Sequence, residues 1–149
     1  MSSQYGARTS VPVSKSIMEI EAALRRYGAS AFHFGSDNEA EYAIIGFKLK
    51  DRQVKMRMPL PDKRQGTTKY QQAERQRYRA LLLVVKAKLE AIAGGITTLE
   101  REFLPDIVTS TGQTVSEILA PQIEEMYRSG RVPSLIGGSG PVGLLEGSR

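Results

Sequence analysis

The feature that most constrains the fold is a change in the spacing of apolar residues, from every second residue to a helical repeat. Across positions 41–60, apolar and polar residues alternate as on strands with one buried face: Ala43, Ile45, Phe47, Leu49, Val54, Met56 and Met58. Across positions 69–93, the apolar residues fall within roughly 100° of helical arc: Tyr78, Leu81, Leu82, Val85, Leu89 and Ile92. The pattern predicts a β-hairpin followed by a long helix that covers its apolar face.

The first half of the chain is predicted to contain an N-terminal helix and three strands. Apolar residues at helical spacing predict a helix over 15–27, with Ser14 as a candidate cap. Ser16 and Glu19 have the spacing of a capping box. Strands are expected over 30–35, 41–50 and 53–60, with a turn over 36–40 and a tight turn at Asp51-Arg52.

The last third of the chain predicts two shorter helices. The first is expected over 98–108, although Pro105 can kink or end it. The second is expected over 115–129, where Thr114 and Glu117 have capping-box spacing. The chain length of 149 residues fits a single domain.

The order of elements predicts one α+β domain over residues 14–131. Its parts are an N-terminal helix, a three-stranded antiparallel sheet packed against a long helix, and two short helices. Residues 1–13 are expected to form a flexible N-terminal tail. Residues 132–149, which are rich in Gly, Ser and Pro, are expected to form a flexible C-terminal tail.

Positive charge is concentrated in one block of the chain. The net charge is +5, but residues 48–88 hold thirteen Lys/Arg against three acidic residues, a balance of +10. The rest of the chain holds eight Lys/Arg against thirteen acidic residues, a balance of −5. A basic block in an otherwise acidic chain indicates a polyanionic partner.

The predicted hairpin carries the first group of candidate binding residues. Like charges placed opposite one another across strands destabilise a sheet, so a ribbon that keeps them is typical of a binding surface. Nucleic-acid phosphates suit such a surface because each neutralised phosphate releases counterions. The alternative is a solvated sheet face whose lysines protect an edge strand from aggregation. These residues are Lys48, Lys50, Arg52, Lys55 and Arg57.

One flank of the predicted long helix carries the second group. Arg75, Arg79 and Lys86 fall within roughly 40° of helical arc. If ribbon and helix meet along one rim, their charges form one groove. Alternatively, this flank is the solvated side of the helix, with long side chains covering apolar neighbours. Tyr42 and Tyr70 are candidates for stacking on bases, or else packing residues.

Enzyme chemistry has little support in the sequence. The chain has no cysteine, which excludes disulfides and thiolate metal sites. His33, flanked by Phe32 and Phe34, is the only histidine and is expected to be a strand residue. We expect no catalytic residue, no cofactor and no metal site. The longest apolar run, 80–85, is far shorter than the about 20 residues that cross a membrane, so a cytoplasmic location is expected.

The basic block resembles a known family of proteins. Residues 41–61 (EYAIIGFKLKDRQVKMRMPLP) and 72–92 (QAERQRYRALLLVVKAKLEAI) are similar to the hairpin and long helix of phage single-strand annealing proteins. These are the Red-beta and Erf kind, with their eukaryotic recombination-mediator relatives. The resemblance covers about half of the chain and is one of topology and charge. The chain also resembles small phage and prophage proteins in general style.

The resemblance implies a function and a set of binding residues. In that family the hairpin and helix build rings or filaments, and basic residues from both line a groove for single-stranded DNA. The resemblance implies this role for Lys48, Lys50, Arg52, Lys55, Arg57, Arg75 and Arg79. It favours a phage- or prophage-type protein that binds and anneals single-stranded DNA in homologous recombination, without enzymatic activity and as a homo-oligomer.

Two alternatives remain open from the sequence. The chain is also compatible with a phage protein-interaction module, an assembly factor or an inhibitor of a host defence, that grips an acidic protein surface without binding nucleic acid. A third hypothesis is a small nuclease or nucleotide-handling enzyme, for which the sequence offers no carboxylate cluster.

Overall fold

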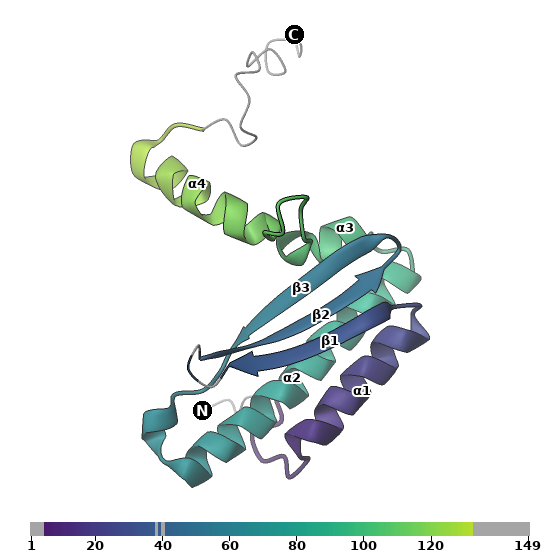
Figure 1. Cartoon of the computed structure of the whole chain (residues 1–149), viewed down its shortest axis with the longest axis vertical. Helices are drawn as coiled ribbons and strands as arrows, with labels where there is room; N and C mark the ends of the chain where they lie inside the picture. Colours follow the sequence, from purple (N-terminus) through teal and green to yellow (C-terminus); the bar gives the residue numbers. More distant parts are fainter. Residues whose placement is uncertain (1–4, 38, 40, 133–149) are drawn as a thin grey trace.

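The predicted α+β class is confirmed by a computed structural model that describes residues 5–37, 39 and 41–132 (Figure 1). Within the described residues, three strands and four helices follow one another with two short 3-10 turns, at Lys63–Gln65 and Leu104–Asp106. The main elements are α1 (Val13–Arg26), β1 (Ser30–Asp37), β2 (Tyr42–Leu49), β3 (Arg52–Pro59), α2 (Thr67–Ala93), α3 (Leu99–Glu102) and α4 (Val115–Ser129).

The three strands form one antiparallel sheet in the order β1-β2-β3. One face, which we call the inner face, buries the alternating apolar residues of the hairpin, as the sequence predicts. Helices α1 and α2 lie side by side on this inner face, and no helix of the described residues lies on the opposite face (Figure 1). The opposite face, which we call the outer face, is therefore open to solvent.

The core lies between the inner face and the two helices. It joins Ile20 and Leu24 of α1 and Val85 and Leu89 of α2 with the apolar residues of β2 and β3. Phe103, which follows α3, is fully buried and packs edge-on against Phe47 of β2, with ring centroids 5.5 Å apart. The segment after α2 is thereby anchored to the same core.

Helix α1 begins differently from the prediction. Pro12 occupies the N-cap, and no side chain caps the helix, so the predicted cap at Ser14 is wrong. Proline is well suited to a helix start because the first N–H groups have no partner within the helix. The predicted capping box is also wrong: Ser16 is fully buried inside α1, and Glu19 pairs with Arg79 of α2.

The segment before α1 is attached to α2. The Gln72 side-chain amide donates to the carbonyl oxygens of Ala7 and Thr9, each at 3.0 Å, and the Gln76 amide donates to that of Tyr5 at 2.8 Å. The described part of the expected tail over 1–13 thus makes defined contacts, and α1 begins within it. Residues 1–4, and all but Val132 of the expected tail over 132–149, lie outside the described residues.

Three places in or beside the sheet hold described non-glycine residues in the left-handed region: Ala31, Glu41 with φ of 60°, and the pair Lys50-Asp51. Lys50 and Asp51 have φ of 47° and 62°, so they are the two residues of the hairpin turn, one position earlier than the predicted Asp51-Arg52. Ala31 has φ of 53° in the irregularity of β1 between Ser30 and His33. A left-handed conformation costs an L-residue roughly 1–2 kcal/mol.

Replacing Ala31 by glycine is therefore expected to stabilise the protein. Glycine adopts positive φ without steric cost, and the greater freedom of the unfolded chain offsets only part of that gain. We expect Ala31→Gly to raise the free energy of unfolding by about 0.5–1 kcal/mol in urea denaturation. The matched control, Ala22→Gly on the exposed side of α1, is expected to lower it by about 1 kcal/mol. If both substitutions lower the free energy of unfolding, Ala31 is not strained.

The expected helix over 98–108 is wrong in its second half. α3 ends at Glu102, and Leu104–Asp106 forms a 3-10 turn that contains Pro105. Ile107 then pairs with Val54, and the Val108 N–H donates to the Gln53 carbonyl at 2.9 Å. Proline stops the helix, and the edge of β3 offers unpaired backbone groups that the chain uses instead.

Helix α4 has the predicted bounds. Thr114 and Glu117 form the predicted capping box: the Thr114 hydroxyl accepts from the Glu117 N–H, and the Glu117 carboxylate accepts from the Thr114 N–H, both at 3.2 Å. α4 contacts the 3-10 turn Leu104–Asp106 and otherwise extends away from the sheet (Figure 1).

The buried phenol of Tyr78 predicts a loss of stability in alkali. Burial raises the pKa of Tyr78 from 10.0 to about 12. Because the folded pKa is the higher one, this stability is complete below pH 10 and is lost as the pH rises through 12. We expect Tyr78 to lower the free energy of unfolding by about 2 kcal/mol between pH 9 and pH 12. Tyr78→Phe keeps the ring and removes the titrating hydroxyl. The difference in alkaline loss of unfolding free energy between the wild-type protein and this variant therefore measures the contribution of Tyr78. An equal loss in both proteins would contradict the prediction.

Candidate nucleic-acid interface

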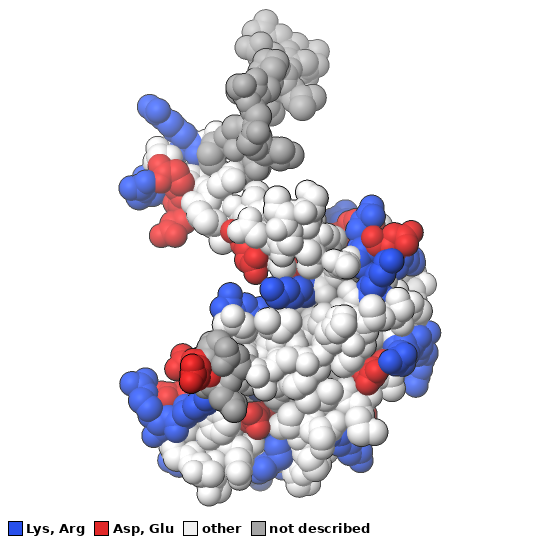
Figure 2. All heavy atoms as spheres, in the orientation of Figure 1, with Lys and Arg blue, Asp and Glu red and all other residues white. Residues whose placement is uncertain are grey.

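The outer face of the sheet gathers three of the predicted binding residues. Strand alternation and register place on it His33 and Gly35 of β1, Tyr42, Ile44, Gly46 and Lys48 of β2, and Gln53, Lys55 and Arg57 of β3. Asp37 of β1 pairs in register with Tyr42, so this face has one acidic position, at the end of β1. Figure 2 shows basic side chains where β3 faces α4, beside an uncharged surface over the middle of the sheet. The outer face is therefore basic and partly apolar.

The basic groups of the outer face differ in their partners. Lys48 and Lys55 have no ion-pair partner in the described part of the chain. The Arg57 guanidinium stacks on the Tyr42 ring, 3.6 Å from its centroid. This stack leaves the charge of Arg57 uncompensated and holds its guanidinium plane on the face, which is the arrangement that recognises flat or anionic groups.

The tip of the hairpin carries the other two predicted residues of the ribbon. Lys50 is exposed in the turn. Arg52 lies 3.8 Å from the carboxylate of Glu100 in α3, and both side chains are about half exposed. An exposed pair at this distance contributes at most about 1 kcal/mol, so Arg52 remains available at the rim of the outer face.

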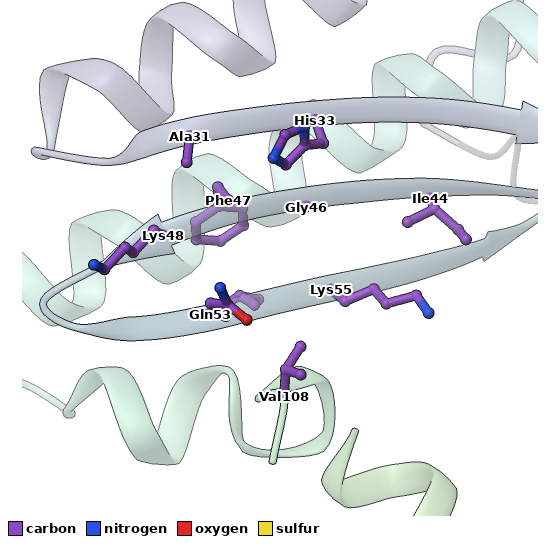
Figure 3. Close-up of a pocket in the computed structure, with 10 residues that line it drawn as sticks. Ala31, His33, Ile44, Gly46, Phe47, Lys48, Gln53, Lys55 and Val108 are labelled. Atoms are coloured by element: carbon purple, nitrogen blue, oxygen red, sulfur yellow. The ribbon is translucent and has the colours of Figure 1, made fainter. Parts of the chain in front are cut away.

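A shallow hollow of about 250 Å³ lies in the outer face (Figure 3). Gly46 of the central strand has no side chain, and its neighbours in register are His33 on β1 and Lys55 on β3. Lys48 and Gln53 lie toward one end of the hollow, and Val108 approaches from beyond β3 (Figure 3). The hollow thus combines an open floor with one imidazole, one amide and two ammonium groups.

The predicted flank of α2 lies elsewhere. Arg79 projects toward α1, where its guanidinium donates to the Glu19 carboxylate at 2.5 and 2.6 Å and to the Ser16 hydroxyl at 3.3 Å. Arg75 donates to the Gln72 side chain at 2.6 Å, and Lys86 is exposed. Arg79 is therefore a structural residue that ties α2 to α1.

The common groove expected from ribbon and helix is not formed within this chain. α2 packs on the inner face through Tyr78 and Val85, while Lys55 and Arg57 project from the outer face. The sheet lies between the two basic groups. Of the two tyrosines predicted to stack on bases, Tyr42 shares the outer face, whereas Tyr70 lies on α2 and donates its hydroxyl to Glu74 at 3.2 Å.

The other flank of α2 serves the fold as well. The Arg77 guanidinium donates to the Pro59 carbonyl at 2.5 Å, at the end of β3. The Lys88 ammonium donates to the Glu102 carbonyl at 2.8 Å and lies 5.5 Å from the centroid of Phe103. Three residues of the basic block, Arg77, Arg79 and Lys88, thus connect α2 to other elements of the fold.

Sequence reasoning missed three residues of the hollow: His33, Gly46 and Gln53. The alternation of β2 and β3 already placed Gly46 and Gln53 on the face of Lys48 and Lys55. The position of His33 depends on the register of β1, which includes an irregularity after Ser30. A pattern of polar and apolar residues does not reveal that register.

Helix α4 presents a second exposed surface. Its residues are at least partly accessible to solvent, and Ile123 and Tyr127 are exposed. Leu104, Val115 and Ile123 contribute to a shallow apolar hollow of about 290 Å³ between α4 and the preceding turn. An exposed apolar surface of this kind is typical of protein interfaces.

Neither a metal site nor a membrane span is found in the part of the chain that the structure describes. Within it, no three His, Asp or Glu side chains lie together as metal ligands would. Its helices are all too short or too polar to cross a bilayer. Comparison of the chain with protein-family models, curated proteins and solved structures gives no significant match.

Proposed function

We propose that this protein binds single-stranded DNA on the outer face of its sheet and promotes the annealing of complementary strands. The observation that carries the proposal is the open outer face, which holds Lys48, Lys55 and Arg57 against one acidic position, Asp37 at the end of β1. This is the function that the sequence resemblance to phage single-strand annealing proteins implies. The action is non-enzymatic and cytoplasmic, in the host cell if the gene belongs to a phage.

The shape of the outer face favours an unpaired strand. Single strands bind to open sheets on which phosphates meet basic side chains and bases stack on flat side chains. Tyr42 with Arg57, and the ring of His33, are flat groups on this face. A DNA duplex is read by a helix or ribbon that enters its major groove, and a broad sheet face does not fit that groove.

The proposal assigns different roles to the predicted residues. Lys48, Lys55 and Arg57 contact the strand, with Lys50 and Arg52 at the rim. Arg79 leaves the binding set because Glu19 and Ser16 hold its guanidinium. The binding residues come from the hairpin, and α2 supports the hairpin from the other side.

Annealing requires several subunits, and we assign the contact between copies to α4. The helix combines exposed apolar residues with Glu117, Glu124 and Glu125 against one basic residue, Arg128. A different face of a second copy that covers α4 would remove Ile123 and Tyr127 from water and leave the basic hairpin open for DNA. Repetition of such a head-to-tail contact builds a ring or a filament.

The exposed apolar surface of α4 also favours a second function, a protein-interaction module that does not bind nucleic acid. Its partner is a different protein that covers Ile123 and Tyr127. Light scattering after size-exclusion chromatography separates the two proposals: an assembly without a partner supports annealing. A monomer that ignores DNA supports the interaction module.

Titration of a labelled oligothymidylate at increasing salt tests the proposed function. We expect dissociation constants in the micromolar range or tighter at about 50 mM salt. With three phosphate contacts, the logarithm of the binding constant is expected to fall with a slope of about −2 against the logarithm of salt. A duplex of the same length is expected to bind more weakly. Absence of binding at low salt, or preference for the duplex, would overturn the proposal.

A further inference from the structure

We infer that the hollow in the outer face is a nucleobase site, in which one base of the bound strand lies over Gly46 while the neighbouring phosphates contact Lys48 and Lys55. This inference rests on the proposed function and adds to it a recognition of bases. Phosphate binding alone needs only charge, whereas the hollow has a defined shape and lining (Figure 3).

The floor of the hollow is open because of one glycine. Gly46 is the middle partner of His33 and Lys55 across the three strands, so a ring and an ammonium group flank a position without a side chain. Ile44 on the same strand adds an apolar wall, and Val108 adds another from beyond β3 (Figure 3). A flat ring can therefore rest against the sheet between β1 and β3.

The size of the hollow suits one ring system. Its volume of about 250 Å³ is several times the roughly 30 Å³ that a water molecule occupies in the liquid. It also lies just below the range of about 300–1,000 Å³ that is typical of sites for drug-sized ligands. A single base fits this range better than a larger molecule.

The chemistry of the lining matches a base attached to a charged backbone. A base has apolar faces and polar edges, and it needs a partner for each. The Gln53 amide offers both a donor and an acceptor, and the His33 imidazole offers a ring face as well as polar nitrogens. Lys48 and Lys55, which have no ion-pair partner in the described chain, provide charge for the adjoining phosphates.

The test compares two oligonucleotides that have the same phosphates. The probes are an oligothymidylate and an oligomer of equal length whose sugars lack bases, measured by fluorescence anisotropy at low salt. The wild-type protein is expected to bind the oligothymidylate about tenfold more tightly, since base stacking and edge contacts act only on that probe. Equal affinity for the two probes would overturn the base site and leave the proposed phosphate binding intact.

A pair of glycine variants locates the effect. Gly46→Val fills the floor of the hollow, where a Cβ meets the His33 Cβ at 3.6 Å and the Val54 oxygen at 3.7 Å, both ordinary van der Waals distances. This variant is expected to lose the tenfold preference and keep its affinity for the abasic oligomer. The control Gly35→Val adds the same side chain to the same face outside the hollow, where a Cβ has no neighbour within 4 Å.

Gly35→Val is expected to keep the preference. If Gly46→Val keeps it too, the hollow is not the base site. If the wild-type protein binds neither probe at low salt, the proposed function fails, and the base site fails with it. Melting temperatures of both variants close to the wild-type value establish that they are folded, and both glycines have backbone angles that valine adopts.

Discussion

Reversing two charges on the outer face, with Lys48→Glu and Lys55→Glu together, is expected to weaken binding of single-stranded DNA by about a hundredfold or more at low salt. Both ammonium groups flank the hollow, and neither has an ion-pair partner in the described chain. The variant therefore loses two phosphate contacts and gains two repulsive charges. The salt dependence of binding is expected to become shallower, because fewer counterions are released.

The control for this variant carries the same change in net charge on another surface. Lys69→Glu with Lys86→Glu alters two exposed positions on α2, on the far side of the sheet from the hollow. We expect its affinity to fall by less than about threefold, because the two exposed side chains lie on α2, across the sheet from the hollow, and salt screens their effect there. Anisotropy titrations of both variants, with melting temperatures to establish folding, provide the measurement.

The outcome also decides between the two predicted surfaces. Equal weakening by both variants would show that overall charge, rather than the outer face, governs binding. A greater loss in the α2 variant would move the binding surface to the helix flank, and Lys86 would then be the residue to examine. Unchanged affinity in the outer-face variant would contradict the proposed interface.

Truncating Phe103 to alanine is expected to lower the free energy of unfolding by about 3–5 kcal/mol. The ring is fully buried, packs edge-on against Phe47, and lies beneath the ammonium of Lys88. Its removal leaves a cavity and ends an aromatic contact worth roughly 0.5–1.5 kcal/mol beyond the buried area. The loss is also expected to loosen the pairing of Ile107 with Val54, since Phe103 anchors that segment to the core.

The neighbouring residue supplies the control for Phe103. Leu104 is about half exposed, and Leu104→Ala is expected to cost less than about 1 kcal/mol. Guanidinium denaturation of the two variants measures both values. If Phe103→Ala costs no more than Leu104→Ala, the segment after α3 is not anchored as the structure shows.

The elements that the sequence predicts well are those with a strong local pattern. The alternation from Ala43 to Met58 can bury its apolar residues only as a sheet with one covered face, and the stripe from Tyr78 to Leu89 can bury them only as a helix. Thr114 and Glu117 cap α4 through contacts three residues apart, which the sequence displays directly.

The predictions that failed depended on partners distant in the chain. Ser16 and Glu19 have capping-box spacing, yet both side chains accept hydrogen bonds from Arg79, which lies sixty residues or more away in the sequence. The helix expected over 98–108 gives way to pairing with Val54 because β3 is an edge strand, and nothing near Ile107 in the sequence indicates that edge.

The sequence by itself determined the class of the fold, the face of the hairpin that is buried, and the block in which the positive charge is concentrated, because each depends on spacing along the chain. Only the tertiary structure decided which basic side chains have an acidic partner. Arg79 pairs with Glu19 of α1, and the sheet separates Lys55 from α2. It also decided that His33 meets Gly46, because the pairing of two strands is set by packing and by a one-residue irregularity in β1.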